Sequence, residues 1–267
     1  MKLKHFICPA LASVLMLASC NKDNNDLSPD GYKETKTNEL KKALVCAKVM
    51  PEASSFNFNS NDDYDAYWEA RRLRRNKTAM FCMKFAEAVG ISTKENTINS
   101  PISAFMVLGM AAESANGETQ KELLDALGMT MDELKEMAHD LSNDLNRSLD
   151  SEKFTYGDNG ERIELTPKNL IKSINSIWTS KYIHFNQEGL ANLSKDFYCD
   201  LFSADFESGE GNRLINAYVK NETRGFLDVD LDVKPNTVLA LMNVLYLKEV
   251  WNDNSRDLND TENKYNF

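Results

Sequence analysis

Residues 96–127 read NTINSPISAFMVLGMAAESANGETQKELLDAL, residues 215–251 read INAYVKNETRGFLDVDLDVKPNTVLALMNVLYLKEVW, and these two stretches decide the fold. In the first stretch, Ser100 followed by Pro101 indicates a helix start. A serine side chain accepts a hydrogen bond from a free helical N–H, and proline suits the first helical position. Residues 104–112 are apolar or glycine on every face, which predicts a buried helix.

Two capping-box patterns follow the buried helix. Thr119 and Glu122 have the spacing of a capping box and predict the start of a second, short helix. Thr130 and Glu133 repeat the pattern and predict a third helix, which is amphipathic. Its apolar face carries Leu134, Ala138, Leu141, Leu145 and Leu149. A buried helix with two satellites also suits many helical domains, so this block alone leaves the fold open.

The second stretch combines a helix with a strand. Four apolar residues repeat at helical spacing, namely Leu214, Ile215, Tyr218 and Val219. A nearly continuous apolar run then extends from Val238 to Leu247 and contains a single polar residue, Asn243. Such a run is typical of a central strand that is buried on both faces. The alternative is that Asn243 marks an edge or a bulge.

Together, in this order, the two stretches resemble the serpins, a family of inhibitors of serine and cysteine proteases. The resemblance runs from about Lys77 to Phe267. It implies an α+β fold in which N-terminal helices pack around a large mixed β-sheet. It also implies an incomplete domain, because the reactive loop and most of the second sheet of a serpin lie C-terminal to the residues present here.

The resemblance assigns roles to individual residues. The serpin region called the shutter, which lies beneath the main sheet, corresponds to Asn96, Ser100, Pro101, Ser103 and Asn243. Buried hydroxyl and amide groups are costly without partners, so we expect them to be hydrogen-bonded, with Asn243 near the two serines. Trp251 matches the breach, where loop insertion begins. Thr223 and Gly225 match the turn that leads from a helix back to the sheet.

The function implied by the resemblance is suicide inhibition. Serpins are a known example of loop insertion into a β-sheet: a target serine or cysteine protease cleaves the loop, which then enters the main sheet. The residue that selects the protease would lie beyond Phe267, so we expect this polypeptide to be an N-terminal fragment of such an inhibitor and no enzyme. The alternatives are a non-inhibitory surface-binding lipoprotein on a serpin scaffold and a truncated product without function.

The N-terminus reads as an export signal. Residues 1–19 combine two early lysines with an apolar stretch that is shorter than the roughly 20 residues a membrane-spanning helix needs, which indicates a signal peptide. Leu17-Ala18-Ser19-Cys20 resembles a bacterial lipobox, so Cys20 is the expected lipidation site and mature N-terminus. The alternative is ordinary secretion with an accidental cysteine. Lipidation would attach the protein to the bacterial outer membrane or cell surface by its lipid anchor.

Composition divides the rest of the chain. Residues 20–63 are polar and predict a lipidated flexible tether with one short helical stretch near residues 39–49, and residues 64–267 form the serpin part. Residues 150–168 read as a polar insertion, either an exposed hairpin or a loop. A basic run, Arg71, Arg72, Arg74 and Arg75, is expected on a solvated helical face.

Charge and residue counts exclude several function classes. With 41 acidic against 31 basic residues the net charge is −10, which argues against nucleic-acid binding. Cys46, Cys82 and Cys199 have neither the spacing of a disulfide framework nor that of a zinc site. His139 and His184 have no nucleophile or metal ligand at a useful spacing. We therefore expect no metal and no cofactor.

Overall fold

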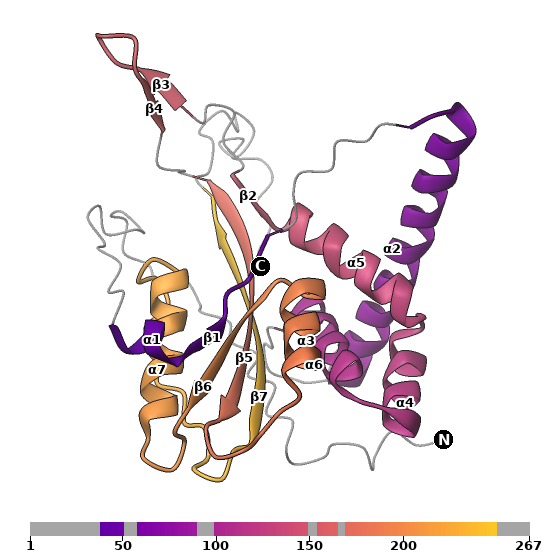
Figure 1. Ribbon diagram of the computed structural model, residues 1–267. Helices are drawn as coiled ribbons and strands as arrows, with labels where there is room; N and C mark the ends of the chain where they lie inside the picture. Colours follow the sequence, from indigo (N-terminus) through magenta and orange to yellow (C-terminus); the bar gives the residue numbers. More distant parts are fainter. Residues whose placement is uncertain (1–37, 51–57, 90–98, 149–153, 165–168, 250–267) are drawn as a thin grey trace, which may run out of the picture.

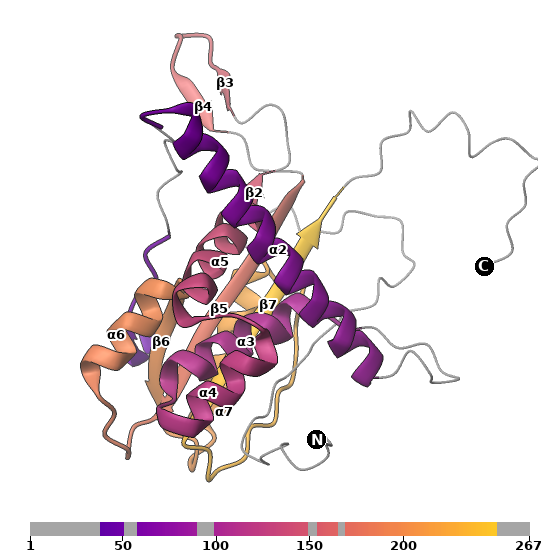
Figure 2. The ribbon, with the colours of Figure 1, turned by 90° about the vertical axis from the view of Figure 1, so that its right-hand side faces the viewer.

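A five-stranded sheet divides the molecule into two layers. The computed structural model describes residues 38–50, 58–89, 99–148, 154–164 and 169–249. Helices α2 to α6 cover one face of the sheet, and α1 and α7 cover the other (Figures 1 and 2). Of the residues singled out in the sequence, Cys20, Asn96, Leu149 and Trp251 lie outside the described residues.

The larger helical layer has α3 at its centre. Its members are α2 (Asn61–Val89), α3 (Pro101–Ser114), α4 (Gly117–Leu127), α5 (Met131–Asp144) and α6 (Gln187–Asp196). Phe105 and Met110 of α3 are completely buried, because other helices and the sheet surround this helix on nearly every side. That placement explains why residues 104–112 carry no charged side chain, and it confirms the predicted buried helix.

The predicted helix starts are mostly correct. Ser100 caps α3, and the Thr130–Glu133 capping box at the start of α5 has both of its hydrogen bonds. The prediction that Thr119 caps the second helix is wrong, because α4 begins at Gly117 and its cap residue, Asn116, makes no side-chain capping bond. The backbone enters α4 through the positive φ of Gly117, a conformation that sequence spacing alone does not reveal.

The sheet is mixed and contains one long central pairing. Its strands are β1 (Leu44–Cys46), β2 (Asn146–Ser148), β5 (Leu170–Ser180), β6 (Cys199–Ala204) and β7 (Leu239–Lys248). The order is β1-β6-β5-β2, and β7 also pairs with β5, antiparallel from Leu170 opposite Lys248 to Thr179 opposite Leu239. Strands β5 and β6 are parallel and are joined through α6. Strand β7 confirms the strand predicted from the apolar run.

Because side chains alternate between the two faces of the strands, the sheet has an apolar core on each face. Ile177 of β5 and Leu241 of β7 face the α3 layer, whereas Trp178 and Met242 face α7 (Glu210–Glu222). Both faces of β5 and β7 are therefore buried, as an apolar run requires. The small hairpin of β3 (Phe154–Tyr156) and β4 (Arg162–Glu164) stands apart from the sheet (Figure 1), which agrees with the hairpin alternative for residues 150–168.

The basic run of α2 lies only partly on a solvated face: Arg72 and Arg75 are exposed as expected, whereas Arg71 and Arg74 are not. Arg74 is buried and forms an ion pair with Asp140 of α5, which is also buried, at 3.2 Å. Arg71 bonds to Asp144 at 3.3 Å. The two helices pack with these side chains between them, so the carboxylates of α5 neutralise the guanidinium groups in the contact. Arg72, by contrast, is exposed and pairs with Glu69 within α2.

Residues 38–50 are folded onto the sheet, which differs from the flexible tether expected for residues 20–63. They form α1 (Asn38–Ala43), β1 and the extended residues up to Met50. We call residues 38–50 the N-terminal strap. In Figure 1 the strap lies beside α7 and along β6. None of the helices in the described ranges has the length and apolarity needed to cross a bilayer.

Candidate functional site

A cluster of buried polar side chains lies at the centre of the β5–β7 pairing. Asn243 stands opposite Asn175 in register, and its Nδ2 donates to Asn175 Oδ1 at 2.7 Å and to Ser173 Oγ at 2.9 Å. Asn175 Nδ2 in turn donates to the carbonyl of Phe197 at 2.8 Å. We call Ser173, Asn175 and Asn243 the sheet amide cluster. It ties β7 to β5 and ties β5 to the end of α6.

One atom of the sheet amide cluster lacks a partner. Asn243 Oδ1 is buried and accepts no hydrogen bond from the residues that the structure describes. Almost all buried polar atoms in proteins are paired, so an orphan of this kind is unusual. Asn243 is therefore buried as predicted, and it retains an acceptor for a donor from outside the described residues.

The two serines beneath the sheet bond to each other and not to Asn243. Ser100 Oγ accepts from the backbone N–H of Ser103 at 3.2 Å, and the two hydroxyl oxygens are 2.9 Å apart. Asn243 is hydrogen-bonded as predicted, and its partners lie on β5, while its proximity to the two serines stays a prediction. At the start of α3 the two hydroxyls are partners of each other, whereas Asn175 is directly opposite Asn243 in the ladder. Pro101 occupies the first turn of α3.

Thr223 and Gly225 lie in the turn that ends α7. Thr223 is completely buried, and its hydroxyl donates to the Val219 carbonyl at 2.8 Å and accepts from the N–H of Leu227 at 3.1 Å. Gly225 has a φ of 78°, which a residue with a Cβ rarely adopts. The turn thereby reverses the chain so that residues after Gly225 pack back against the α7 side of the sheet.

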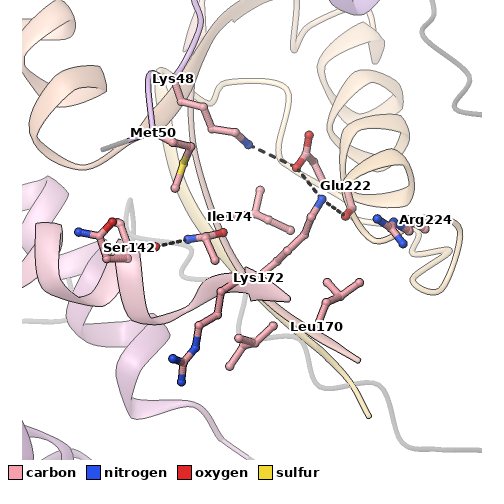
Figure 3. Close-up of a pocket in the computed structure, with 12 residues that line it drawn as sticks. Lys48, Met50, Ser142, Leu170, Lys172, Ile174, Glu222 and Arg224 are labelled. Carbon is pink, nitrogen blue, oxygen red and sulfur yellow. Dashed lines mark hydrogen bonds and ion pairs between the residues drawn. The ribbon is translucent and has the colours of Figure 1, made fainter. Parts of the chain in front are cut away.

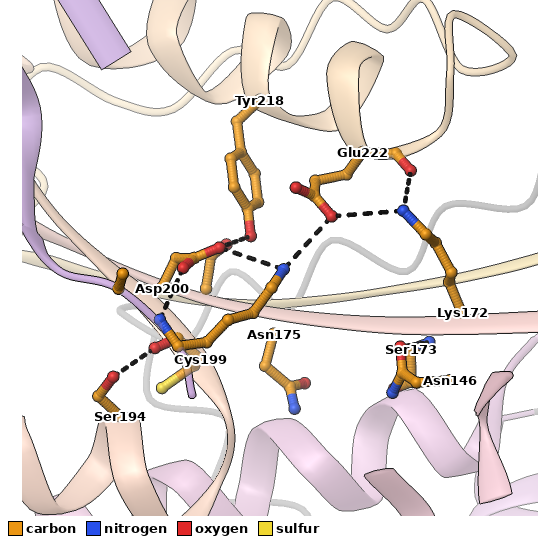
Figure 4. Close-up of polar contacts among 12 residues, drawn as sticks. Asn146, Lys172, Ser173, Asn175, Ser194, Cys199, Asp200, Tyr218 and Glu222 are labelled. Atoms are coloured by element: carbon orange, nitrogen blue, oxygen red, sulfur yellow. Dashed lines mark hydrogen bonds and ion pairs between the residues drawn. The ribbon is translucent and has the colours of Figure 1, made fainter. Parts of the chain in front are cut away.

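A second polar network, which sequence reasoning missed, lies on the α7 side of the sheet. Tyr218 of α7 donates its hydroxyl to Asp200 of β6 at 2.7 Å (Figure 4). Burial, aided by the Asp200 carboxylate, raises the pKa of Tyr218 well above its usual value, so this hydroxyl keeps its proton. Asp200 also accepts from the backbone N–H of Lys48 at 2.8 Å. Asp200 thus links the helix, the sheet and the N-terminal strap.

Two lysines meet at the C-terminal end of α7. Lys48 Nζ lies 3.2 Å from Asp200 and 3.3 Å from Glu222, and Lys172 of β5 lies 3.8 Å from the same Glu222 carboxylate (Figures 3 and 4). Lys172 also donates to the Glu222 backbone carbonyl. Positive charge at a helix C-terminus is favourable, because the last carbonyls of the helix have no partners within it.

A pocket of about 370 Å³ opens beside these lysines (Figure 3). Its apolar wall includes Leu170 and Ile174 of β5, and its polar wall includes Glu222 and the strap residue Lys48. Met50 of the strap also lines it. The strap therefore supplies part of the pocket, so the shape of the pocket depends on strap docking.

The described residues offer no evident catalytic chemistry. They contain no group of three or more His, Cys, Asp or Glu side chains that could hold a metal ion. Burial raises the pKa of the Cys199 thiol, so this buried cysteine is not a nucleophile. His184 is exposed and stands alone in a connecting segment.

Comparison with known proteins identifies the family. The family described as "Serpin (serine protease inhibitor)" matches residues 76–266. The chain belongs to the serpin family. This is a family of protease inhibitors and not of enzymes. Serpin membership agrees with the α+β architecture and with the position of both sequence stretches discussed above.

Relatives of this serpin include both antiproteinases and binding globulins. Alpha-1-antiproteinase 2 of Equus caballus is 30% identical over 171 residues, covering 60% of this chain and 37% of the relative. Alpha-1-antiproteinase of Rattus norvegicus is 25% identical, with 78% and 48% covered. Corticosteroid-binding globulin of Ovis aries is 26% identical, with 73% and 43% covered. The chain thus spans less than half the length of these relatives.

Solved serpin structures share the fold. A loop C-sheet serpin polymer superposes with a TM-score of 0.54 at 23% identity, covering 77% of this chain and 48% of that one. Reactive loop cleaved human thyroxine-binding globulin gives a TM-score of 0.53 at 22% identity, with 67% and 50% covered. The N-terminal strap, residues 38–50, precedes the family match at residue 76 and is not explained by it.

Proposed function

We propose that this chain supplies the N-terminal helices and main-sheet strands of a serpin that inhibits serine or cysteine proteases by loop insertion. The observation that carries the proposal is the strand pairing of β7 and the hydrogen bonding of its central residue. Within the described residues, this long strand pairs with β5 alone, and its central Asn243 retains an unpaired buried acceptor. A sheet that receives another strand next to β7 needs a strand edge without a partner, and Asn243 Oδ1 offers an acceptor to the incoming segment.

The hydrogen bonds beneath the sheet suit such a rearrangement. The sheet amide cluster and the Ser100–Ser103 pair consist of neutral groups, and each net hydrogen bond contributes only about 1 kcal/mol. Neutral bonds of this strength hold the strands in register and can be exchanged for others when the strands move. A buried ion pair at the same place would resist movement far more. This is the role we propose for the shutter residues named from the sequence.

The second candidate is a non-inhibitory binding protein on the same scaffold. It is favoured by the similarity to corticosteroid-binding globulin, at an identity close to that of the rat alpha-1-antiproteinase. A binding protein of this class would keep the fold described here and would not need to trap a protease.

An inhibitor and a non-inhibitory binding protein are expected to behave differently with proteases. The chain, together with any residues that its gene encodes after Phe267, is mixed with a panel of serine and cysteine proteases and analysed under denaturing conditions. A covalent 1:1 complex with at least one protease is expected for an inhibitor. Cleavage without a complex throughout the panel would reject inhibition. Residues 21–267 alone are the matched control and are expected to form no complex.

We also propose that the protein is held at a bacterial outer membrane or cell surface through lipid on Cys20. The support is the Leu17-Ala18-Ser19-Cys20 string at the end of a short apolar run. Cells expressing the chain or Cys20→Ala are labelled with a fatty-acid analogue. The label is expected on the chain and not on the variant, which should accumulate as an unprocessed precursor. Equal labelling of both would exclude Cys20 as the acylated residue.

A further inference from the structure

The N-terminal strap lies outside the family match but is integrated into the sheet. Strand β1 pairs antiparallel with the outer edge of β6, with Leu44 opposite Phe202 and Cys46 opposite Leu201. An unpaired sheet edge exposes a row of N–H and C=O groups that can bind another chain. By pairing with this edge, the strap makes β6 an interior strand.

Apolar contacts hold the strap on the α7 side of the sheet. Leu40, Ala43 and Leu44 are partly buried against the core that contains Phe202 and Tyr218. Leu40 and Ala43 are three residues apart on α1, so they share one face of this short helix. A purely solvated tether would not place its apolar residues in this way.

Lys48 joins the strap to both the sheet and α7. Its backbone N–H and its Nζ both contact Asp200 of β6, and the same Nζ contacts Glu222 of α7. The side chains of Lys48 and Asp200 are only 23% and 12% exposed, so water screens this pair weakly. Without Lys48, the buried Asp200 would keep Tyr218 as a donor but would lose its positive partner.

The second charged contact of the strap is weaker. Glu39 of α1 pairs with Arg213 of α7, but these side chains are 50% and 59% exposed. Exposed ion pairs contribute little to stability. Lys48 is therefore expected to hold the strap and Glu39 to contribute marginally.

We infer that residues 38–50 act as a clamp that holds α7 against β6 and closes the outer edge of the main sheet. Release of the strap removes its contacts with α7 and uncovers the outer edge of β6. The clamp itself does not depend on the proposed function. Its consequence for inhibition rests on the proposed function, because α7 covers the face of a sheet that would have to admit another strand (Figure 1).

Hydrogen–deuterium exchange tests the clamp. Residues 21–267 are compared with Lys48→Met, which keeps most of the aliphatic stem, and with Glu39→Gln. Arg72→Gln is the control, because Arg72 forms an exposed ion pair far from the strap. Lys48→Met should accelerate exchange in β6 and α7 by about tenfold while α3 is unchanged, and Glu39→Gln should change it less than about twofold.

A deletion of residues 38–50 completes the test. In this variant β6 and α7 should exchange faster than α3, and a synthetic peptide of residues 36–50 should restore their protection where a scrambled peptide does not. Should the deletion unfold the whole domain, the Lys48→Met result decides. Equal exchange of β6 and α7 in Lys48→Met and Arg72→Gln would overturn the clamp. No step involves a protease, so failure of the proposed function would not alter these results.

Discussion

At the scale of single residues, Asn243 shows how a polar side chain can organise an apolar strand. Its amide donates two hydrogen bonds to β5, and its register opposite Asn175 makes both possible. A strand slipped by one residue would place an apolar side chain against the amide of Asn175 and move Asn243 to the α7 side. Asn243 therefore specifies the register of the central pairing as well as contributing to its stability.

Replacing Asn243 should be costly. Asn243→Ala removes both donors and leaves Asn175 Oδ1 buried without them, so the free energy of unfolding should fall by about 1–3 kcal/mol. Urea denaturation measures the difference. Leu247→Ala, at an exposed position of the same strand, is the control and should cost much less. Equal losses for the two variants would show that the amide contacts do not stabilise the sheet.

At the scale of secondary-structure elements, Gly109 allows α3 to approach its neighbours closely. A Cβ on Gly109 would lie 2.8 Å from Phe197 Cε1 and 3.2 Å from Leu134 Cδ1. Phe197 is completely buried, so its ring has little room to move. The glycine thus permits the contact of α3 with α5 and α6, although glycine disfavours a helix interior by about 1 kcal/mol.

Gly109→Ala tests whether overpacking of the core outweighs the gain in helix propensity. Overpacking in a core costs about 1–3 kcal/mol and should exceed the gain in helix propensity, so the variant should be destabilised. Gly189→Ala in α6 is the matched control, since its nearest neighbours would lie 3.9 Å away, and it should be neutral or stabilising. Thermal unfolding of both variants checks the prediction. Stabilisation by Gly109→Ala would contradict the prediction and would mean that α3 shifts to make room for the added methyl group.

The Thr130–Glu133 capping box should make the start of α5 sensitive to acid. Lys77 binds the Glu133 carboxylate at 2.7 Å, and the Thr130 N–H donates to the same oxygen at 2.9 Å. The Lys77 hydrogen bond, followed by that of Thr130, lowers the pKa of Glu133. A lowered pKa in the folded state gives stability that is complete above the unfolded pKa of about 4.3 and is lost as the pH falls through the folded value.

Glu133→Gln tests this dependence. Gln preserves the capping geometry but loses the charge opposite Lys77, so at pH 7 and low salt the variant should be less stable by about 0.5–1 kcal/mol, allowing for solvent screening. The difference should shrink as the pH is lowered from 7 towards 3, because the wild-type carboxyl becomes protonated as the pH falls through its lowered folded pKa. Urea unfolding at both pH values measures it. Glu118→Gln, at an exposed site in α4, is the control and should change the stability at pH 7 much less.

Elements with local signals could be predicted from the sequence, whereas contacts between distant elements could not. Ser100 and Thr130 predicted two helix starts, because the capping hydrogen bond of each joins residues within a stretch of four. Asn243 could be identified as a lone polar residue in an apolar strand. Its hydrogen-bond partners could not, because they depend on the register of β7 with β5. The roles of Arg74 and Lys48 are set by Asp140 and Asp200, which are 66 and 152 residues away, so no local pattern revealed them.

At the scale of the whole molecule, β7 leaves an unpaired strand edge within the described residues. Strand β7 pairs with β5 alone, and Leu247 is 56% exposed on it. Long apolar edges promote association with other chains. Residues 21–267 should therefore self-associate in a concentration-dependent manner when purified alone.

Two variants locate the surface responsible. Leu247→Lys should weaken association, since charge on an edge strand opposes strand pairing. Met83→Lys changes an exposed apolar residue of α2 and should have little effect. Analytical ultracentrifugation over a range of concentrations gives the average mass. A larger effect of Met83→Lys than of Leu247→Lys would assign association to the helical layer.

The long central pairing has a consequence for how the chain folds. Ser173 and Asn243 are separated by 70 residues, and Lys48 and Asp200 by 152, so the sheet is built from contacts of high sequence separation. Such topologies fold slowly, whereas the helices from α2 to α5 can begin to associate locally. During synthesis β5 leaves the ribosome long before β7, and the edge of β5 that pairs with β7 has no partner strand in that interval. The nascent chain therefore needs either rapid export or a chaperone until β7 has been synthesised.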